Sequence, residues 1–358
     1  MMWPDCRLLD LLKIELPIVQ APMAGASGSA MAIATSNAGG LGSLPCAMLN
    51  IEAMYSEMGI IRQQTDNPIN VNFFVRQEPS QDLEKEKNWI ALLSKYYSEF
   101  ELNDIEQKTS NGRAPFSKDT CEFIEDVKPE VVSFHFGLPK KELLDRVKAI
   151  GCIVMSSATT VDEARWLEAQ GCDVIIAQGY EAGGHRAMFL SNDINTQIGS
   201  MALIPQISDA VTVPVIAAGG IADGRGVAAA FSLGASGVQV GTPYLLTKEA
   251  MVSDLHRKAL KNSKSDETAL TNIFTGRPAR GIVNRVMAEI GPITSKAPDF
   301  PLSGSALTPI KIAAEEKGLS DFSSLWSGQA ASLAYETSSA DFTKDLARDA
   351  LKRMGSLV

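Results

Sequence analysis

The chain has 358 residues, of which 45% are hydrophobic, and carries a formal net charge of −9. A chain of this length can form roughly two domains, or one α/β barrel of about 200–250 residues with an addition. The acidic balance argues against a surface that binds the phosphate backbone of nucleic acids. No apolar run approaches the ~18 residues that a membrane-spanning helix needs, so we expect contact with neither nucleic acid nor membrane.

The five cysteines are odd in number and scattered, and the chain contains no C-x-x-C pair. Nothing pairs them with histidines at the spacing of a zinc site, so we expect reduced thiols and no bound metal. The first residues include several charged side chains and lack the long apolar stretch of a secretory signal. These features predict a cytoplasmic protein.

Eight short apolar segments have the length and composition of buried β-strands. They are continuously apolar rather than alternating, which is typical of parallel strands covered on both faces. In chain order they are residues 17–23, 40–45, 69–75, 131–136, 152–158, 174–179, 213–219 and 237–242. Helix-like stretches lie between most of them, so the chain predicts an α/β fold of the (β/α)₈ TIM-barrel type.

Three of the intervening helices have clear signals. A capping-box pattern, Thr-Val-Asp-Glu, opens the helix expected over residues 160–171, and a glycine closes it. Apolar residues at helical spacing indicate a helix over residues 138–150. An acidic start and a glycine stop indicate another over residues 223–233.

Two regions break the strand–helix rhythm. Residues 76–128 are too long for one crossover and include the polar stretch 103–117, so we expect a lengthened third loop–helix unit that is partly a flap. The region after residue 242 has few β-branched runs. Helices are expected there over residues 247–262, 306–317 and 322–333.

These regions predict two parts of the molecule. Residues 1–242 and 338–358 would form the barrel, with a final helix over residues 342–354 that returns to close it. Residues 243–337 would form a mostly helical cap that contributes to the substrate pocket. The alternative is a separate, non-catalytic module that binds a partner through the carboxyl-terminal helices.

Two glycine-rich turns follow the last two predicted strands. The first includes Gly219 and Gly220. The second comprises Gln239, Val240, Gly241 and Thr242. Glycine lets the backbone come close to a ligand, and a helix start offers N–H groups and a positive dipole end. The last two strand loops of such barrels often build a phosphate site, so the turns predict a phosphate-bearing cofactor held by backbone groups.

His185 is our candidate for proton transfer among the three histidines. It follows Gly183 and Gly184 just beyond the sixth predicted strand, at the barrel face that carries active sites. Imidazole titrates near neutral pH and can take a proton from carbon or return one. The alternative is a histidine that is simply bonded to a neighbouring carbonyl. We expect His135 to be a satisfied core histidine rather than part of the pocket floor, and His256 to be a solvated surface residue.

Side chains near the ends of the first, third and sixth strands form a further group, Gln20, Met23, Asn72 and Gln178. A barrel would point them at one central ligand. An amide both donates and accepts hydrogen bonds, which suits a heterocycle with carbonyls and ring nitrogens. Met23 is as readily explained by packing as by contact with a ring.

Four segments together resemble the nitronate monooxygenases, formerly grouped as 2-nitropropane dioxygenases, which are FMN-dependent (β/α)₈ barrels. They are residues 17–25 (PIVQAPMAG), 178–186 (QGYEAGGHR), 217–221 (AAGGI) and 237–242 (GVQVGT). Residues 134–139 and 326–329 extend the resemblance over nearly the whole chain.

The resemblance implies an enzyme that oxidises alkyl nitronates, such as propionate 3-nitronate, with O₂ to carbonyl compounds and nitrite. It implies that His185 is the catalytic base. The residues that would hold FMN are Met23, Asn72, Gln178, Gly183, Gly219, Gly220, Gln239, Val240, Gly241 and Thr242. The partners would be a small nitronate or nitroalkane and O₂, and the protein would be a monomer or a homodimer.

Two other enzyme classes stay open. An FMN-dependent enoyl-thioester (enoyl-ACP) reductase that uses NAD(P)H is similar in the same glycine-rich segments. A flavin-free barrel that acts on a sugar phosphate would usually need a lysine or a carboxylate pair at the strand ends. Glu181 is the only acid beside His185, and no lysine closes any of the eight predicted strands, which argues against that class.

Overall fold

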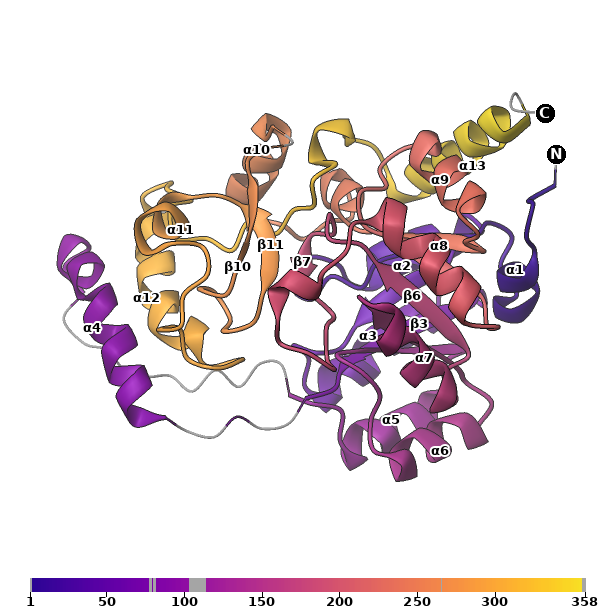
Figure 1. Ribbon diagram of the computed structural model, residues 1–358, viewed down its shortest axis with the longest axis horizontal. Helices are drawn as coiled ribbons and strands as arrows, with labels where there is room; N and C mark the ends of the chain where they lie inside the picture. Colours follow the sequence, from indigo (N-terminus) through magenta and orange to yellow (C-terminus); the bar gives the residue numbers. More distant parts are fainter. Residues whose placement is uncertain (1, 77–78, 80–81, 103–113, 265, 356–358) are drawn as a thin grey trace.

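Eight parallel strands form the central barrel of the computed structural model, which describes residues 2–76, 79, 82–102, 114–264 and 266–355 (Figure 1). In spatial order the strands are β1 (Ile18–Gln20), β9 (Gly237–Val240), β8 (Val215–Ala218), β6 (Val174–Gln178), β5 (Ile153–Ala158), β4 (Val131–His135), β3 (Ile69–Phe74) and β2 (Gly42–Pro45). Leu41 joins the ends of this ring, because its amide donates to the carbonyl of Ile18 and its carbonyl accepts from Gln20, each at 2.9 Å. The predicted (β/α)₈ barrel is confirmed.

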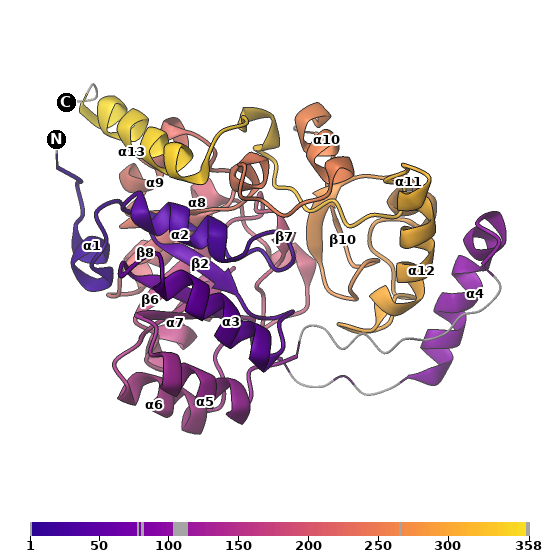
Figure 2. The same ribbon diagram turned by 180° about the vertical axis from the view of Figure 1, so that it is seen from behind.

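Helices surround the barrel (Figures 1 and 2). They are α1 (Arg7–Leu12), α2 (Ser29–Asn37), α3 (Ile51–Arg62), α5 (Lys118–Val127), α6 (Lys141–Ala149), α7 (Val161–Ala169), α8 (Ser200–Ala210), α9 (Gly224–Ser232) and α13 (Ser339–Gly355). The final helix α13 packs against α9 and α2. Within the described part of the chain, no helix combines the length and the apolarity needed to cross a bilayer.

The helix signals are confirmed with one correction. Thr160 caps α7 by accepting from the amide of Glu163 at 3.2 Å. The Glu163 carboxylate, however, does not complete the capping box at Thr160. It accepts from the amide and the hydroxyl of Thr159, both at 2.7 Å, and from the amides of Phe189 and Leu190. The carboxylate therefore ties the start of α7 to the loop that follows His185.

Helix α4 (Leu83–Glu99), from the long third unit, lies away from the barrel and packs against α12 (Ser303–Glu316) (Figure 1). Trp89 donates from Nε1 to the carbonyl of Ser303 at 3.1 Å, and the hydroxyl of Tyr97 donates to the carbonyl of Ala306 at 2.7 Å. Their aromatic rings are part of a second core that α4 shares with α12. Most of the polar stretch that we expected to belong to a flap, residues 103–113, lies outside the described residues.

The remaining segments add a small antiparallel sheet of β10 (Thr268–Thr271), β11 (Ala279–Ile282) and β7 (Gly184–His185). Short helices accompany it: η1 (Ile194–Thr196), η2 (Thr242–Leu246), α10 (Asp254–Asn262), α11 (Arg285–Ile290) and η3 (Ala331–Leu333). The helix expected over residues 247–262 therefore begins seven residues later than predicted.

The helix expected over residues 322–333 is wrong. Its backbone runs beside β11 instead, with the amide of Ile282 donating to the carbonyl of Leu325 at 2.8 Å and the amide of Ser327 donating to that of Arg280 at 3.3 Å. Gly281 forms a bridge with Trp326. Pairing with a distant strand thus takes the backbone groups that a local helix would have used.

We predict that Gly42→Ala lowers the free energy of unfolding by about 3 kcal/mol, because overpacking a filled core forces the backbone apart. A Cβ at this position in β2 would lie 2.0 Å from the carbonyl oxygen of Ala32. The matched control is Gly59→Ala in α3, whose Cβ would meet nothing within 4 Å. It should raise stability by about 0.5–1 kcal/mol. Urea unfolding of both variants checks this, and equal midpoints would contradict the packing of β2 on α2.

Candidate functional site

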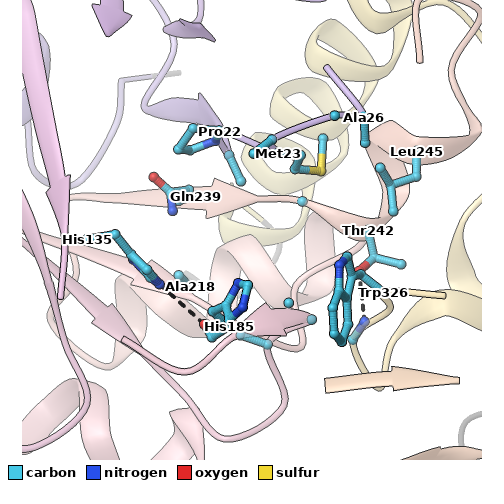
Figure 3. Close-up of a pocket in the computed structure, with 18 of the residues that line it drawn as sticks. Pro22, Met23, Ala26, His135, His185, Ala218, Gln239, Thr242, Leu245 and Trp326 are labelled. Atoms are coloured by element: carbon cyan, nitrogen blue, oxygen red, sulfur yellow. Dashed lines mark hydrogen bonds between the residues drawn. The ribbon is translucent and has the colours of Figure 1, made fainter. Parts of the chain in front are cut away.

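A cavity of about 520 Å³ lies at the carboxyl ends of the barrel strands and is also lined by residues from beyond residue 242 (Figure 3). Its size is within the ~300–1,000 Å³ usual for small-molecule sites. The predicted ligand-binding side chains and turns that line it are Met23, Asn72, Gln178, Gly183, His185, Gly219, Gly220, Gln239, Gly241 and Thr242. Tertiary structure therefore brings these segments to one space.

Two residues expected near the ligand do not line the cavity. Val240 is 1% exposed and packs in the hydrophobic core, because successive strand residues point to opposite sides and its neighbour Gln239 takes the cavity side. Gln20 is fully buried, and its Oε1 accepts from the amide of Ser43 at 2.8 Å. Its amide joins β1 to β2 instead of facing a ligand.

The amides in the cavity wall differ in how they are paired. Asn72 donates from Nδ2 to the hydroxyl of Ser133 at 2.9 Å. Gln178 accepts from the amide of Ala187 at 2.9 Å. The buried Oε1 of Gln239, in contrast, has no hydrogen-bond partner among the described residues. Most buried polar atoms in native proteins are paired, and this oxygen is available to accept a hydrogen bond from a group bound in the cavity.

The glycine turn after β8 has a backbone conformation that favours glycine. Gly219 and Gly220 have φ angles of 106° and 72°, in the region that favours glycine. The turn after β9 is braced by Thr242, whose hydroxyl accepts from the amide of Gly328 at 2.9 Å. These turns line the cavity with backbone on two adjacent strand ends, which suits a phosphate group.

The backbone of His185 is held from several sides. As part of β7 it pairs with Ala279 of β11. Its carbonyl accepts from Nε2 of Gln178 at 3.0 Å and from Nε2 of His135 at 3.3 Å (Figure 3). Its own Nε2 lies 3.0 Å from the hydroxyl oxygen of Thr275. The imidazole is therefore fixed in the cavity wall as the sequence predicted, with a polar contact at Nε2.

Aromatic rings surround the imidazole of His185. The ring centroids of Phe74, Phe136, Phe300 and Trp326 all lie 5.4–6.0 Å from it. Phe74 is the last residue of β3 and Phe136 directly follows β4, whereas the other two rings come from later segments of the chain. The imidazole is thus packed between the barrel and the later segments.

His135 combines the two roles considered for it. It has a backbone partner, as a core histidine would, and it also lines the cavity. Burial, together with the charges of Arg277 and Arg186, lowers the pKa of His135 to about 3. The ring is therefore neutral near pH 7, and its hydrogen is on Nε2 because the carbonyl of His185 can only accept.

The surface position expected for His256 is wrong. The side chain is 9% exposed, lines the cavity and lies with Nε2 3.0 Å from the carbonyl of Trp326. Burial is the main cause that lowers the pKa of His256. The charged residues next to His256 in the sequence suggested an exposed side chain. In the structure, His256 lies on the face of α10 that points into the protein.

Buried arginines are the main feature that the sequence did not reveal. Arg186 is fully buried and donates to the carbonyls of Gln178 and Gly179 and to Oε1 of Gln197. Burial, with the nearby charge of Arg280, lowers the pKa of Arg186 to about 10. It fixes the loop that carries His185. The sequence shows an arginine next to the glycine-flanked His185, but it does not show that the arginine side chain points into the protein.

The far wall of the cavity is polar and belongs to α12 and the segment after it. Lys311 lies 3.8 Å from Glu315, which in turn accepts from the hydroxyl of Ser323 at 2.6 Å. All three line the cavity. Across the described residues, no group of three His, Cys, Asp or Glu side chains is arranged to hold a metal ion.

Comparison with known proteins identifies the family of the chain. A family model described as nitronate monooxygenase matches residues 5–349. A nitronate monooxygenase of Pseudomonas aeruginosa is 38% identical over 346 residues, which are 96% of this chain and 98% of the relative. The solved structure of a nitroalkane oxidase from Streptomyces ansochromogenes has a TM-score of 0.88 and 36% identity, and covers 98% of this chain and 100% of that one.

A more distant structure, FabK from Thermotoga maritima, has a TM-score of 0.74 and 26% identity over 98% of this chain and 97% of its own. The family model and the first relative each span almost the whole sequence. The resemblance found in the glycine-rich segments is thus confirmed. This chain is an oxidoreductase that belongs to the nitronate monooxygenase family, which is flavin-dependent.

Proposed function

We propose that the protein is an FMN-dependent nitronate monooxygenase that converts alkyl nitronates and O₂ to carbonyl compounds and nitrite. The observation that carries this proposal is the convergence of His185, the unpaired oxygen of Gln239 and two glycine turns on one cavity. The reaction class is inferred from the family. The assignment of that reaction to this cavity is inferred from these residues.

The residues present fit a flavin. The unpaired oxygen of Gln239 needs an N–H donor, and the imide group of a flavin ring has one. Backbone at Gly219, Gly220 and Gly241 can approach a phosphate without a lysine. Asn72 and Gln178 would frame the ring, although their amides already have protein partners. When bound, FMN would take the electrons that the nitronate gives up.

His185 would act on the substrate. A neutral nitroalkane must lose its α-proton before it becomes electron-rich, and the imidazole can accept that proton. A preformed nitronate needs no proton removed, so the same side chain would only orient its nitro group. The aromatic rings around His185 would limit the directions from which a substrate can approach the imidazole.

The segments after residue 242 would shape the substrate end of the cavity. We propose residues 243–337 as a cap on a barrel formed by residues 1–242 and 338–358, with the ion pair of Lys311 and Glu315 in the cavity wall. An anionic substrate tail, as in propionate 3-nitronate, would compete with Glu315 for the ammonium group of Lys311. The five cysteines of the protein are free thiols, which is in keeping with a reducing cytoplasm.

An anaerobic spectrum tests the proposed function. The purified protein should be yellow, and addition of a nitronate without O₂ should bleach the flavin absorbance. Rapid bleaching by NADH or NADPH, with no response to nitronate, would instead favour an enoyl-thioester reductase. Colourless protein that takes up no FMN would contradict the flavin assignment.

We predict that His185→Asn lowers turnover of neutral nitroalkanes by about 10²-fold or more, the usual contribution of a general base. The asparagine keeps a polar group of similar size, so FMN content should be unchanged. Turnover of preformed nitronates should fall far less, and steady-state assays on both substrate forms measure the difference. Equal losses on both forms would remove His185 from the base role.

We predict that Lys311→Met raises the KM for propionate 3-nitronate about tenfold, because hydrogen bonds to charged groups are worth about 1.5–3 kcal/mol. The KM for ethyl nitronate, which has no carboxylate, should change less than about twofold. Lys258→Met is the control, since Lys258 is exposed on α10 and does not line the cavity. Equal effects on both nitronates would argue against an anionic tail at Lys311.

A further inference from the structure

Thr275 connects the imidazole of His185 to the backbone of a turn that follows β10. Its hydroxyl oxygen lies 3.0 Å from Nε2 of His185, and the same hydroxyl donates to the carbonyl of Arg277 at 3.3 Å. Thr275 is 1% exposed, so water does not compete for these contacts.

The turn that carries Thr275 is rigidly placed. Gly276 has a φ of 86°, and a Cβ there would lie 2.2 Å from the carbonyl oxygen of Pro298. The guanidinium of Arg277 lies 4.0 Å from the ring centroid of Phe136 and donates to the carbonyl of Met188. The hydroxyl is therefore held at a fixed place beside the imidazole.

We propose that Thr275 is a positioning residue that keeps a hydrogen on Nε2 of His185, so that Nδ1 is the nitrogen that accepts the proton. This inference rests on the proposed role of His185 as base. A hydroxyl has one hydrogen, and the carbonyl of Arg277 can only accept it. With the hydrogen directed there, the Thr275 oxygen accepts from Nε2–H.

The same arrangement serves both charge states of the imidazole. When the α-C–H bond of a nitroalkane breaks, its proton forms a bond with Nδ1 and its electron pair stays on the substrate as the nitronate. Both ring nitrogens of His185 then carry hydrogens, and Nε2–H continues to donate to Thr275. No group has to rotate, which favours the transfer.

Nitrogen NMR of the flavin-loaded enzyme labelled with ¹⁵N-histidine tests the tautomer directly. The chain has three histidines, so the ring signals of His185 can be assigned by their loss in His185→Asn. We expect the wild-type ring to carry its hydrogen on Nε2. Thr275→Ser should keep that pattern, and Thr275→Val should give a mixture of tautomers. A hydrogen on Nδ1 in the wild type would overturn the proposal without any variant having to fold.

Kinetics separate this role from a purely structural one. Thr275→Val should lower kcat on a neutral nitroalkane about tenfold, which is the loss of one ordinary hydrogen bond. Turnover of a preformed nitronate should change less than about twofold, and Thr275→Ser should restore the nitroalkane rate. In the His185→Asn background, Thr275→Val should have no further effect. Equal losses on both substrates, or an added loss in that background, would overturn the proposal.

The proposed function can fail separately from this inference. If His185→Asn slows both substrate forms equally, His185 is not the base, and that result concerns the proposed function. The tautomer seen by NMR, and its response to Thr275→Val, still decide whether the hydroxyl of Thr275 holds the hydrogen on Nε2.

Discussion

The site depends on the pairing of the two-residue strand β7 with β11. Strand β7 is part of a barrel loop and also part of the antiparallel sheet. Gly184 and His185 follow the sixth barrel strand, yet they pair with Arg280 and Ala279 of β11. The direction of the imidazole is therefore set by the barrel and by the later segments together. A shift of β11 would move the imidazole of His185 relative to the strand ends that are proposed to hold the cofactor.

Buried guanidinium groups support this strand and give its surroundings a positive charge. Arg186 and Arg280 are almost completely buried, and both donate to backbone carbonyls rather than to carboxylates. Arginine keeps its charge even when burial lowers its pKa. Besides burial, the charges of Arg277 and Arg186 oppose a second proton on His135. Arg186 thus fixes the loop and also disfavours a charged His135.

Glu181 precedes His185 in the same loop but hydrogen-bonds elsewhere, whereas the imidazole has a hydroxyl partner. Glu181 lines the cavity, but its carboxylate accepts from the amide of Ser200 at 2.9 Å, at the start of α8. A carboxylate there also suits the positive end of a helix. Thr275, in contrast, can orient the imidazole without adding negative charge next to a bound anion. The carboxylate is thus bound to the scaffold, and a neutral hydroxyl lies beside the imidazole of His185.

The eight strands, the glycine turns and the position of His185 at the barrel mouth could be predicted from the amino-acid sequence, because buried parallel strands, glycine pairs and a glycine-flanked histidine leave local patterns. The sequence could not place His256, Gln20 or Thr275, whose roles depend on residues far away along the chain. The expected helix over residues 322–333 failed for the same reason, since pairing with β11 outweighs local helical preference. Local periodicity encodes the strands and helices, whereas the direction of each polar side chain was decided by the burial and the hydrogen-bond partners that only the tertiary fold supplies.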